Sequence, residues 1–167
     1  MDAKEKRKAT PLQEQPQCFV PTPLGLIHLR EDQHGITLVQ FADAMPAPAV
    51  FGQKGLYLAD ARAQLLEYFA GKRKEFDVPL SPSGTPFQKK VWAALQSIPY
   101  GETRSYQQIA QMIGNLKATR AVGMANNRNP IAILIPCHRV IGKNGKLVGY
   151  AGGMERKQYL LALEASR

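Results

Sequence analysis

Residues 131–140, which read Ile-Ala-Ile-Leu-Ile-Pro-Cys-His-Arg-Val, constrain the fold more than any other stretch. The unbroken apolar run indicates a buried element, although periodicity alone does not separate a strand from a helix segment. The isoleucines and the bounding Pro130 and Pro136 favour extended chain. We therefore expect a buried strand with Cys137 at its end, where a rigid element can hold a nucleophile in place.

Cys137 is a candidate nucleophile because His138 and Arg139 follow it directly. A lone cysteine is most often a small buried hydrophobe, but cationic neighbours lower the pKa of a thiol and raise its thiolate fraction. In extended chain, adjacent side chains point to opposite faces. His138 could therefore serve Cys137 only if the chain turns there, or through a bridging water.

The basic residues of the chain are concentrated in its second half. Residues 1–80 carry ten Lys and Arg and ten Asp and Glu, whereas residues 81–167 carry twelve Lys and Arg and three Asp and Glu. The net charge of +9 thus belongs to the second half, which suggests a polyanion such as nucleic acid as partner. Lys and Arg that only make a surface soluble are the alternative.

The two cysteines, Cys18 and Cys137, form no paired framework and no metal-ligand spacing. The first residues are too polar for a signal peptide, and no apolar run approaches membrane length. We expect a cytoplasmic protein without a metal or another cofactor.

The chain divides into a polar tail (1–17), an N-terminal structural domain (18–80) and a basic C-terminal domain (81–167). Extended runs at 24–29 and 36–41, separated by a turn, predict a hairpin, and residues 58–70 have helical spacing. Residues 44–50 are expected to form a loop. The N-terminal domain offers no evident chemistry.

The C-terminal domain is predicted to be mainly helical. Thr85 with Gln88, and Ser105 with Gln108, have the spacing of capping boxes that begin helices. A short helix from residue 106, a Gly114 turn and a second helix over about 117–127 have the outline of a helix-turn-helix. Small residues make this second helix slim, and a last helix is expected over 155–163, with Tyr159, Leu160 and Leu163 packed inward. Trp92 is expected in the core.

The motif Pro136-Cys137-His138-Arg139-Val140 resembles the active-site signature of the O6-alkylguanine-DNA alkyltransferases, and the resemblance extends over about residues 81–164. It implies an α+β fold, with a small antiparallel sheet and helix, ribonuclease-H-like, before a winged-helix-like domain that carries the helix-turn-helix. It also implies irreversible, single-turnover transfer of an alkyl group from O6-alkylguanine in DNA to a cysteine.

The resemblance assigns roles to individual residues. Cys137 is the alkyl acceptor, His138 the base that acts on it through water, and Glu164 the carboxylate that orients His138. Asn129 braces the active-site segment, and Arg139 is a structural ion-pair residue. The guanine pocket is lined by loop residues: Val148, Tyr150, Ala151 and Gly152. Ala151 stands where some relatives carry serine, which leaves only a backbone N–H for the O6 atom.

By the same resemblance, the partner is double-stranded DNA, entered from the minor groove, with the damaged guanine flipped out of the duplex. Arg120 fills the vacated space, and Tyr106 crowds the target phosphate and contacts the base. The remaining DNA contacts come from Ala118, Thr119, Ala121, Gly123 and Arg128. A monomer is expected, and cooperative binding along DNA stays open.

Two other functions fit part of the sequence. One is a DNA-binding regulator with a redox- or alkylation-sensing cysteine, and the other is a cysteine hydrolase. The regulator does not account for Tyr106, Arg120, Asn129, His138 and Glu164 together. The hydrolase has no use for a slim basic helix.

Overall fold

The computed structural model of the chain describes residues 15–44 and 55–166. Most of the polar tail, and the loop expected over residues 44–50 apart from its first residue, lie outside the described residues. None of the helices in the described part is both long and apolar enough to cross a membrane.

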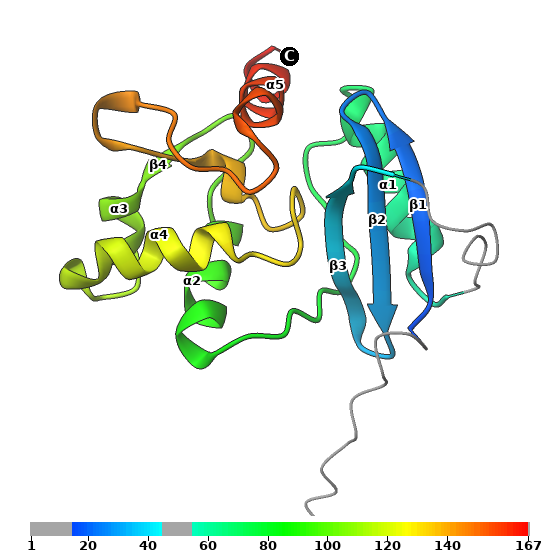
Figure 1. Ribbon diagram of the computed structural model, residues 1–167, viewed down its shortest axis with the longest axis horizontal. Helices are drawn as coiled ribbons and strands as arrows, with labels where there is room; N and C mark the ends of the chain where they lie inside the picture. Colours follow the sequence, from blue (N-terminus) through cyan, green and yellow to red (C-terminus); the bar gives the residue numbers. More distant parts are fainter. Residues whose placement is uncertain (1–14, 45–54, 167) are drawn as a thin grey trace, which may run out of the picture.

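The first half is a three-stranded antiparallel sheet with one helix (Figure 1). Its elements are β1 (Gln17–Thr22), β2 (Gly25–Asp32), β3 (Gly35–Ala42) and α1 (Leu58–Phe69), and the strand order is β1-β2-β3. Helix α1 packs against β1 and β2. The strand order places β3 at one edge of the sheet, and this edge faces the second half. The predicted hairpin is confirmed as β2 and β3, whereas β1 was not predicted from its own residues.

The second half is mainly helical. Its elements are α2 (Pro86–Gln96), β4 (Arg104–Ser105), α3 (Tyr106–Met112), η3 (Leu116–Ala118), α4 (Thr119–Asn127), η4 (Cys137–Arg139), β5 (Val140–Ile141), η5 (Lys143–Gly145) and α5 (Met154–Ala165). The α+β fold is therefore confirmed.

Both capping boxes are present. The backbone N–H of Gln88 donates to Thr85 Oγ1 at 3.1 Å, and the N–H of Gln108 donates to Ser105 Oγ at 3.1 Å. The Gln side chains accept in return from the backbone N–H groups of Thr85 and Ser105. These bonds satisfy two backbone N–H groups at the start of each of the helices α2 and α3.

The core prediction for Trp92 is confirmed, because this residue is 2% exposed and its Nε1 donates to the Ala125 carbonyl at 2.9 Å. That bond joins α2 to α4, the second helix of the helix-turn-helix. The inward packing predicted for Tyr159 is wrong, since this side chain is 38% exposed, whereas Leu160 is fully buried.

The strand predicted over the apolar run before Cys137 is also wrong. Ile131 forms only an isolated bridge with Val39, and a turn follows in which the N–H of Ile135 donates to the Ile131 carbonyl at 3.0 Å. Ile133 has a φ of 70°, a strained conformation that costs a β-branched residue about 1–3 kcal/mol. The apolar run reflects burial between the two halves and not extended backbone.

The outer edge of β3 holds this turn in place. The Val39 N–H donates to the Pro130 carbonyl at 3.0 Å, and the Ala132 N–H donates to the Val39 carbonyl at 2.9 Å. Nearer the start of β3, Ile36 bonds in the same way to Pro79 and Ser81. The segment that leads to Cys137 is thus bonded to the N-terminal sheet.

Candidate active site and nucleic-acid interface

The cysteine lies in a short 3-10 turn. Cys137 and His138 both belong to η4 and are 6% and 0% exposed. The chain does turn at this point, which meets one of the two conditions under which His138 can serve Cys137.

Two asparagines hold the backbone on either side of the turn. Asn129 Nδ2 donates to the carbonyls of Ile131 and Ile135, at 3.2 and 2.8 Å, and its Oδ1 accepts from the Ile131 N–H at 3.0 Å. Asn126, which is 1% exposed, directs its Nδ2 to the Cys137 carbonyl at 3.4 Å. Asn126 was not predicted, because nothing in the sequence separates it from its polar neighbours.

Glu164 is the centre of a buried hydrogen-bond network. Its Oε2 lies 2.6 Å from His138 Nε2 and accepts a 2.5 Å bond from the Tyr68 hydroxyl. Arg139 Nε donates to Oε1 at 2.7 Å, so that the ion pair predicted for Arg139 is present. His138 Nδ1 is buried and has no hydrogen-bond partner among the described residues. If Nε2 carries the proton that Glu164 accepts, Nδ1 is left as a base.

Burial and the neighbouring groups determine the protonation states. Burial would raise the pKa of Glu164, but the hydrogen bonds from His138 and Arg139 outweigh it and hold that pKa at about 2. Burial lowers the pKa of His138, which favours the neutral imidazole.

The expectation of a lowered thiol pKa is wrong for the described structure. Burial raises the pKa of Cys137 more than Asn129 and Lys157 lower it. Arg139, the cation next to the thiol in the sequence, does not lower this pKa, because its guanidinium is bonded to Glu164. A base is therefore needed to remove the thiol proton.

Lys157 is fully buried and was not predicted. Its Nζ donates to the carbonyls of Val140 and Val148, at 2.6 and 3.1 Å. Burial lowers the pKa of Lys157, and Cys137 raises it. Lys157, Leu160 and Glu164 share one buried face of α5, and this helical spacing could have identified both charged residues from the sequence.

Cys137 opens into a cavity of about 500 Å³ between the two halves of the molecule. Of the four predicted pocket residues, Tyr150, Ala151 and Gly152 line this cavity, whereas Val148 does not. The further lining residues are Leu38, Val39, Gln40, Phe41, Asp43, Asn126, Asn127, Arg128, Asn129, Pro130, Ala132 and Arg156. The described residues contain no cluster of three or more His, Cys, Asp or Glu that could hold a metal ion.

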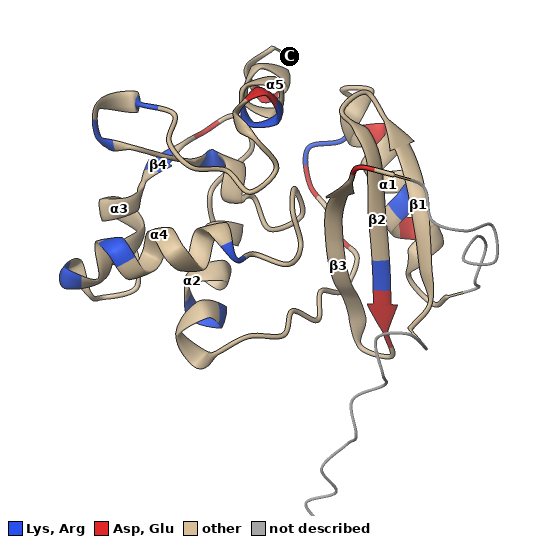
Figure 2. Cartoon of the chain, in the orientation of Figure 1, with Lys and Arg blue, Asp and Glu red and all other residues tan. Residues whose placement is uncertain are grey.

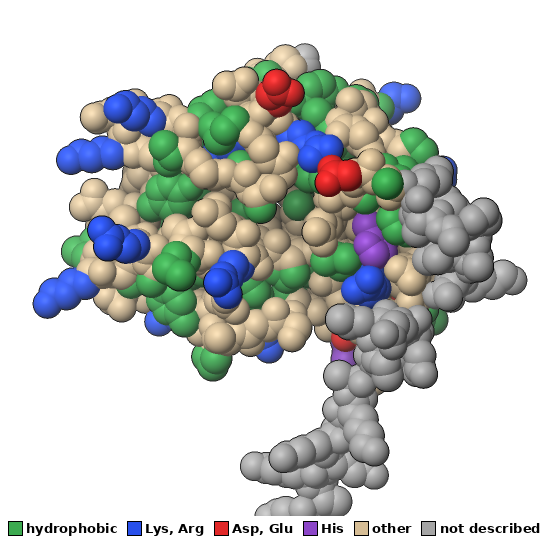
Figure 3. Space-filling model, in the orientation of Figure 1, with side chains coloured by type: hydrophobic (Ala, Val, Ile, Leu, Met, Phe, Trp, Pro, Cys, Tyr) green, Lys and Arg blue, Asp and Glu red, His purple; other side chains and the backbone are tan. Residues whose placement is uncertain are grey.

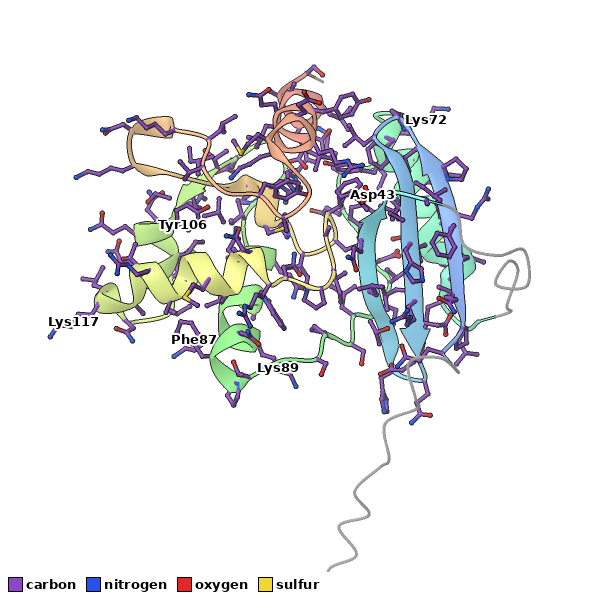
Figure 4. All side chains as sticks on the ribbon, in the orientation of Figure 1. Asp43, Lys72, Phe87, Lys89, Tyr106 and Lys117 are labelled. Atoms are coloured by element: carbon purple, nitrogen blue, oxygen red, sulfur yellow. The ribbon has the colours of Figure 1, made fainter. Side chains whose placement is uncertain are left out.

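Tyr106, the first residue of α3, joins the helix-turn-helix to the pocket loop (Figure 4). Its hydroxyl donates to the Val148 carbonyl at 3.0 Å, and a Cβ at Gly123 would lie 3.7 Å from its ring. Burial raises the pKa of Tyr106, and the nearby Cys137 raises it further.

Helix α4 presents Arg120 and Ala121 to solvent, while Val122 and Ala125 face the core. Ala118, Thr119 and Gly123 are half-buried, and Arg128 is exposed. Lys and Arg recur on α2, on α4 and around η5, whereas acidic residues are found mostly on the sheet half (Figure 2). Figure 3 shows basic side chains along the face of the second half.

A helix-turn-helix with a basic surface, joined to a cavity that contains a thiol, defines a class of protein that binds nucleic acid and places a cysteine beside it. Two family models match almost the whole of the described chain. The model described as 6-O-methylguanine DNA methyltransferase, ribonuclease-like domain, matches residues 18–82, and the model for the DNA binding domain of the same family matches residues 86–166.

Individual relatives agree. The methylated-DNA–protein-cysteine methyltransferase of Methanosarcina acetivorans is 54% identical over 148 residues, which are 87% of this chain and 95% of that protein. The crystal structure of the Mycobacterium tuberculosis O6-methylguanine methyltransferase matches with a TM-score of 0.82 and 46% identity, over 92% of this chain and 94% of that one. A complex of the M. tuberculosis protein with DNA matches with a TM-score of 0.81 and 47% identity, over 90% of this chain and 92% of that one. The chain belongs to the 6-O-methylguanine DNA methyltransferase family.

Proposed function

We propose that the chain repairs DNA by transferring the alkyl group of O6-alkylguanine to Sγ of Cys137, once per molecule. Repair by alkyl transfer from DNA to a protein cysteine is the activity of the family. The observation that carries the assignment to Cys137 is its place in the cavity beside the His138–Glu164 pair. The other cysteine, Cys18, lies on β1 in the sheet.

The proposed reaction is an in-line displacement at the alkyl carbon. The thiol proton passes through one water to His138 Nδ1, and Glu164 stabilises the imidazolium that forms. Sγ then bonds to the alkyl carbon while the bond from that carbon to O6 breaks. The proton ends on guanine, the leaving group of the displacement, which remains in the DNA strand as the neutral base. The thioether has no route back to a thiol.

The leaving guanine needs hydrogen bonds where its charge develops. We assign this role to the Tyr106 hydroxyl at N3 and to the backbone N–H groups of the loop at O6. Tyr106 must release the Val148 carbonyl to do so, and Lys157 remains on that carbonyl to hold the loop. Asn129 keeps the turn in shape throughout.

DNA approaches through α4 and the basic surface around it. We propose that α4 enters the minor groove, that the target nucleotide is flipped into the cavity, and that Arg120 fills the space it leaves. The slim exposed face of α4 supports this docking. Ala118, Thr119, Ala121, Gly123 and Arg128 are the further proposed contacts.

We also propose that the division between the structural and the DNA-binding domain lies near Ser81, and that the protein acts as a monomer in the cytoplasm. Two free thiols suit a reducing compartment.

Intact mass measurement tests the function. The full chain is incubated with a duplex that carries one O6-methylguanine, and we expect a mass gain of one methyl group in place of one hydrogen. Peptide mapping should place the methyl on Cys137. Cys18→Ser is the matched control and should gain the same mass. An unchanged mass, with DNA affinity that responds to oxidation, would instead support the regulator.

A further inference from the structure

The cavity that contains Cys137 has two unlike walls. The wall from the second half is polar and includes Asn126, Asn127, Arg128 and Asn129. The wall from the first half is formed by residues 38–41 of β3 and is mainly apolar, with Asp43 beyond the end of the strand (Figure 4). A base with hydrogen-bonding edges suits the polar wall from the second half, whereas an alkyl group suits the mainly apolar wall from β3.

Phe41 brings the β3 wall into contact with the pocket loop. A Cβ at Gly152 would lie 2.9 Å from Phe41 Cδ2 and 2.7 Å from Tyr150 Cε1, closer than such atoms approach. A side chain at position 152 would therefore clash with the two rings, which pack against the backbone of Gly152. Phe41 and Tyr150 thus meet at the loop that lines the cavity beside Cys137.

Arg156 holds this contact together from α5. Its guanidinium carbon lies 4.5 Å from the centre of the Phe41 ring, a cation–π distance. Its Nη1 donates to the Gly152 carbonyl and its Nε to the Leu24 carbonyl, both at 3.2 Å. Among the described residues no carboxylate pairs with Arg156, so its contacts are the loop, the sheet and the ring.

We propose that Phe41 is a specificity-determining residue for the alkyl group, and that Arg156 is the residue that positions it. The proposal rests on the function assigned above to Cys137. In an in-line displacement the reacting carbon lies between Sγ and O6, so any substituent on that carbon must extend sideways into the cavity. At about 500 Å³ the cavity is roomy. Apolar contact with the β3 wall therefore favours groups larger than methyl.

The test compares two duplexes that differ only in the lesion, O6-methylguanine or O6-benzylguanine. Single-turnover transfer to the full chain is followed by intact mass, and the benzyl-to-methyl ratio of rate constants is the readout. Flipping and DNA binding are common to both duplexes and largely cancel in this ratio. A merely structural role of Phe41 would change both rates together.

We expect Phe41→Ala to lower the benzyl-to-methyl ratio about tenfold, the size typical for losing an apolar contact in a pocket. Phe41→Leu, which keeps more of the apolar surface, should lower it less. Arg156→Met should shift the ratio in the same direction, by about threefold, because it removes two hydrogen bonds and the cation over the ring. Phe19→Ala is the matched control, since Phe19 stacks on His28 in the same sheet outside the cavity.

An unchanged ratio in both Phe41 variants, or an equal change in Phe19→Ala, would overturn the proposal while alkyl transfer itself stands. A wild-type chain that gains no mass from either duplex would overturn the proposed function instead.

Discussion

The Tyr68 hydroxyl on α1 and the Glu164 carboxylate on α5 are hydrogen-bonded at 2.5 Å, although 96 positions separate them in the chain. The same oxygen of Glu164 faces His138. The N-terminal half, which offers no chemistry in its sequence, therefore contributes a donor to the network around the cysteine.

Tyr68→Phe should slow alkyl transfer several-fold and leave DNA affinity unchanged. The variant removes one hydrogen-bond donor from a buried, charged carboxylate, which lowers the free energy of unfolding by about 2 kcal/mol. The carboxylate that orients His138 is then held less firmly. Single-turnover rates and DNA titrations measure the two effects. Tyr57→Phe, which removes a hydroxyl that donates to the Gln33 carbonyl at 3.3 Å, is the control and should behave as wild type.

Glu164 should make the protein sensitive to acid. Its folded pKa of about 2 lies below its ordinary value of 4.5, so its contribution is present above pH 4.5 and is lost as the pH falls towards 2. Between about pH 6 and 3 this single group should remove about 2 kcal/mol of stability. Urea unfolding at both pH values measures this loss.

Glu164→Gln is less stable at neutral pH, because Arg139 loses its partner, but it should lose correspondingly less on acidification. An equal loss in both proteins would show that other carboxylates cause the acid sensitivity.

Cys137→Ser should abolish alkyl transfer and keep DNA binding. A serine hydroxyl forms far less of its anion at neutral pH than a thiol does, while the DNA-binding surface is untouched. Intact mass and a binding titration check both statements. Substantial transfer by the serine variant would contradict the assignment of the acceptor.

Arg120→Ala and His138→Ala should affect two substrates differently. Arg120 is assigned only to flipping, which involves unstacking that costs a few kcal/mol, so its loss should slow repair of duplex DNA far more than transfer from free alkylguanine base. His138 is assigned to the thiol, so its loss should slow both. The measurement is single-turnover transfer with both substrates. Equal slowing of both by Arg120→Ala would mean that Arg120 shapes the pocket or the fold.

Binding to undamaged duplex should weaken steeply with salt. If about six phosphates are neutralised, affinity falls about a thousandfold between about 50 and 200 mM salt. Lys117→Gln, in η3 directly before α4, should reduce the salt slope by about one, whereas Lys72→Gln on the sheet half should not (Figure 4). An affinity that does not change with salt concentration would contradict binding through the phosphates.

Local rules predicted the elements whose causes are local. The capping boxes of Thr85 and Ser105 each need only residues three positions apart, and the β2–β3 hairpin needs only its alternation and turn. The same holds for Trp92, whose place in the apolar stripe of α2 is set by helical spacing. The family resemblance of the cysteine motif implied the small antiparallel sheet and the residue roles, which spacing alone does not contain.

Contacts between distant segments could not be predicted. The turn at Ile133 exists because β3 bonds to Pro130 and Ala132, and no local preference would place an isoleucine at positive φ. The partnerships of Tyr68 with Glu164 and of Phe41 with Arg156 likewise join the two halves. Burial raises the pKa of Cys137. The cationic residues next to it in the sequence predicted the opposite direction.

The bonds that β3 makes along its outer edge, through Ile36 and Val39, have a consequence for solubility. An uncovered edge strand is a template for pairing with other chains, and here the linker at Pro79 and Ser81 and the turn at Pro130 and Ala132 occupy it. Any change that separates the two halves would therefore expose a self-associating edge together with the thiol. In this fold the same backbone bonds that set Cys137 in place also protect the protein against aggregation.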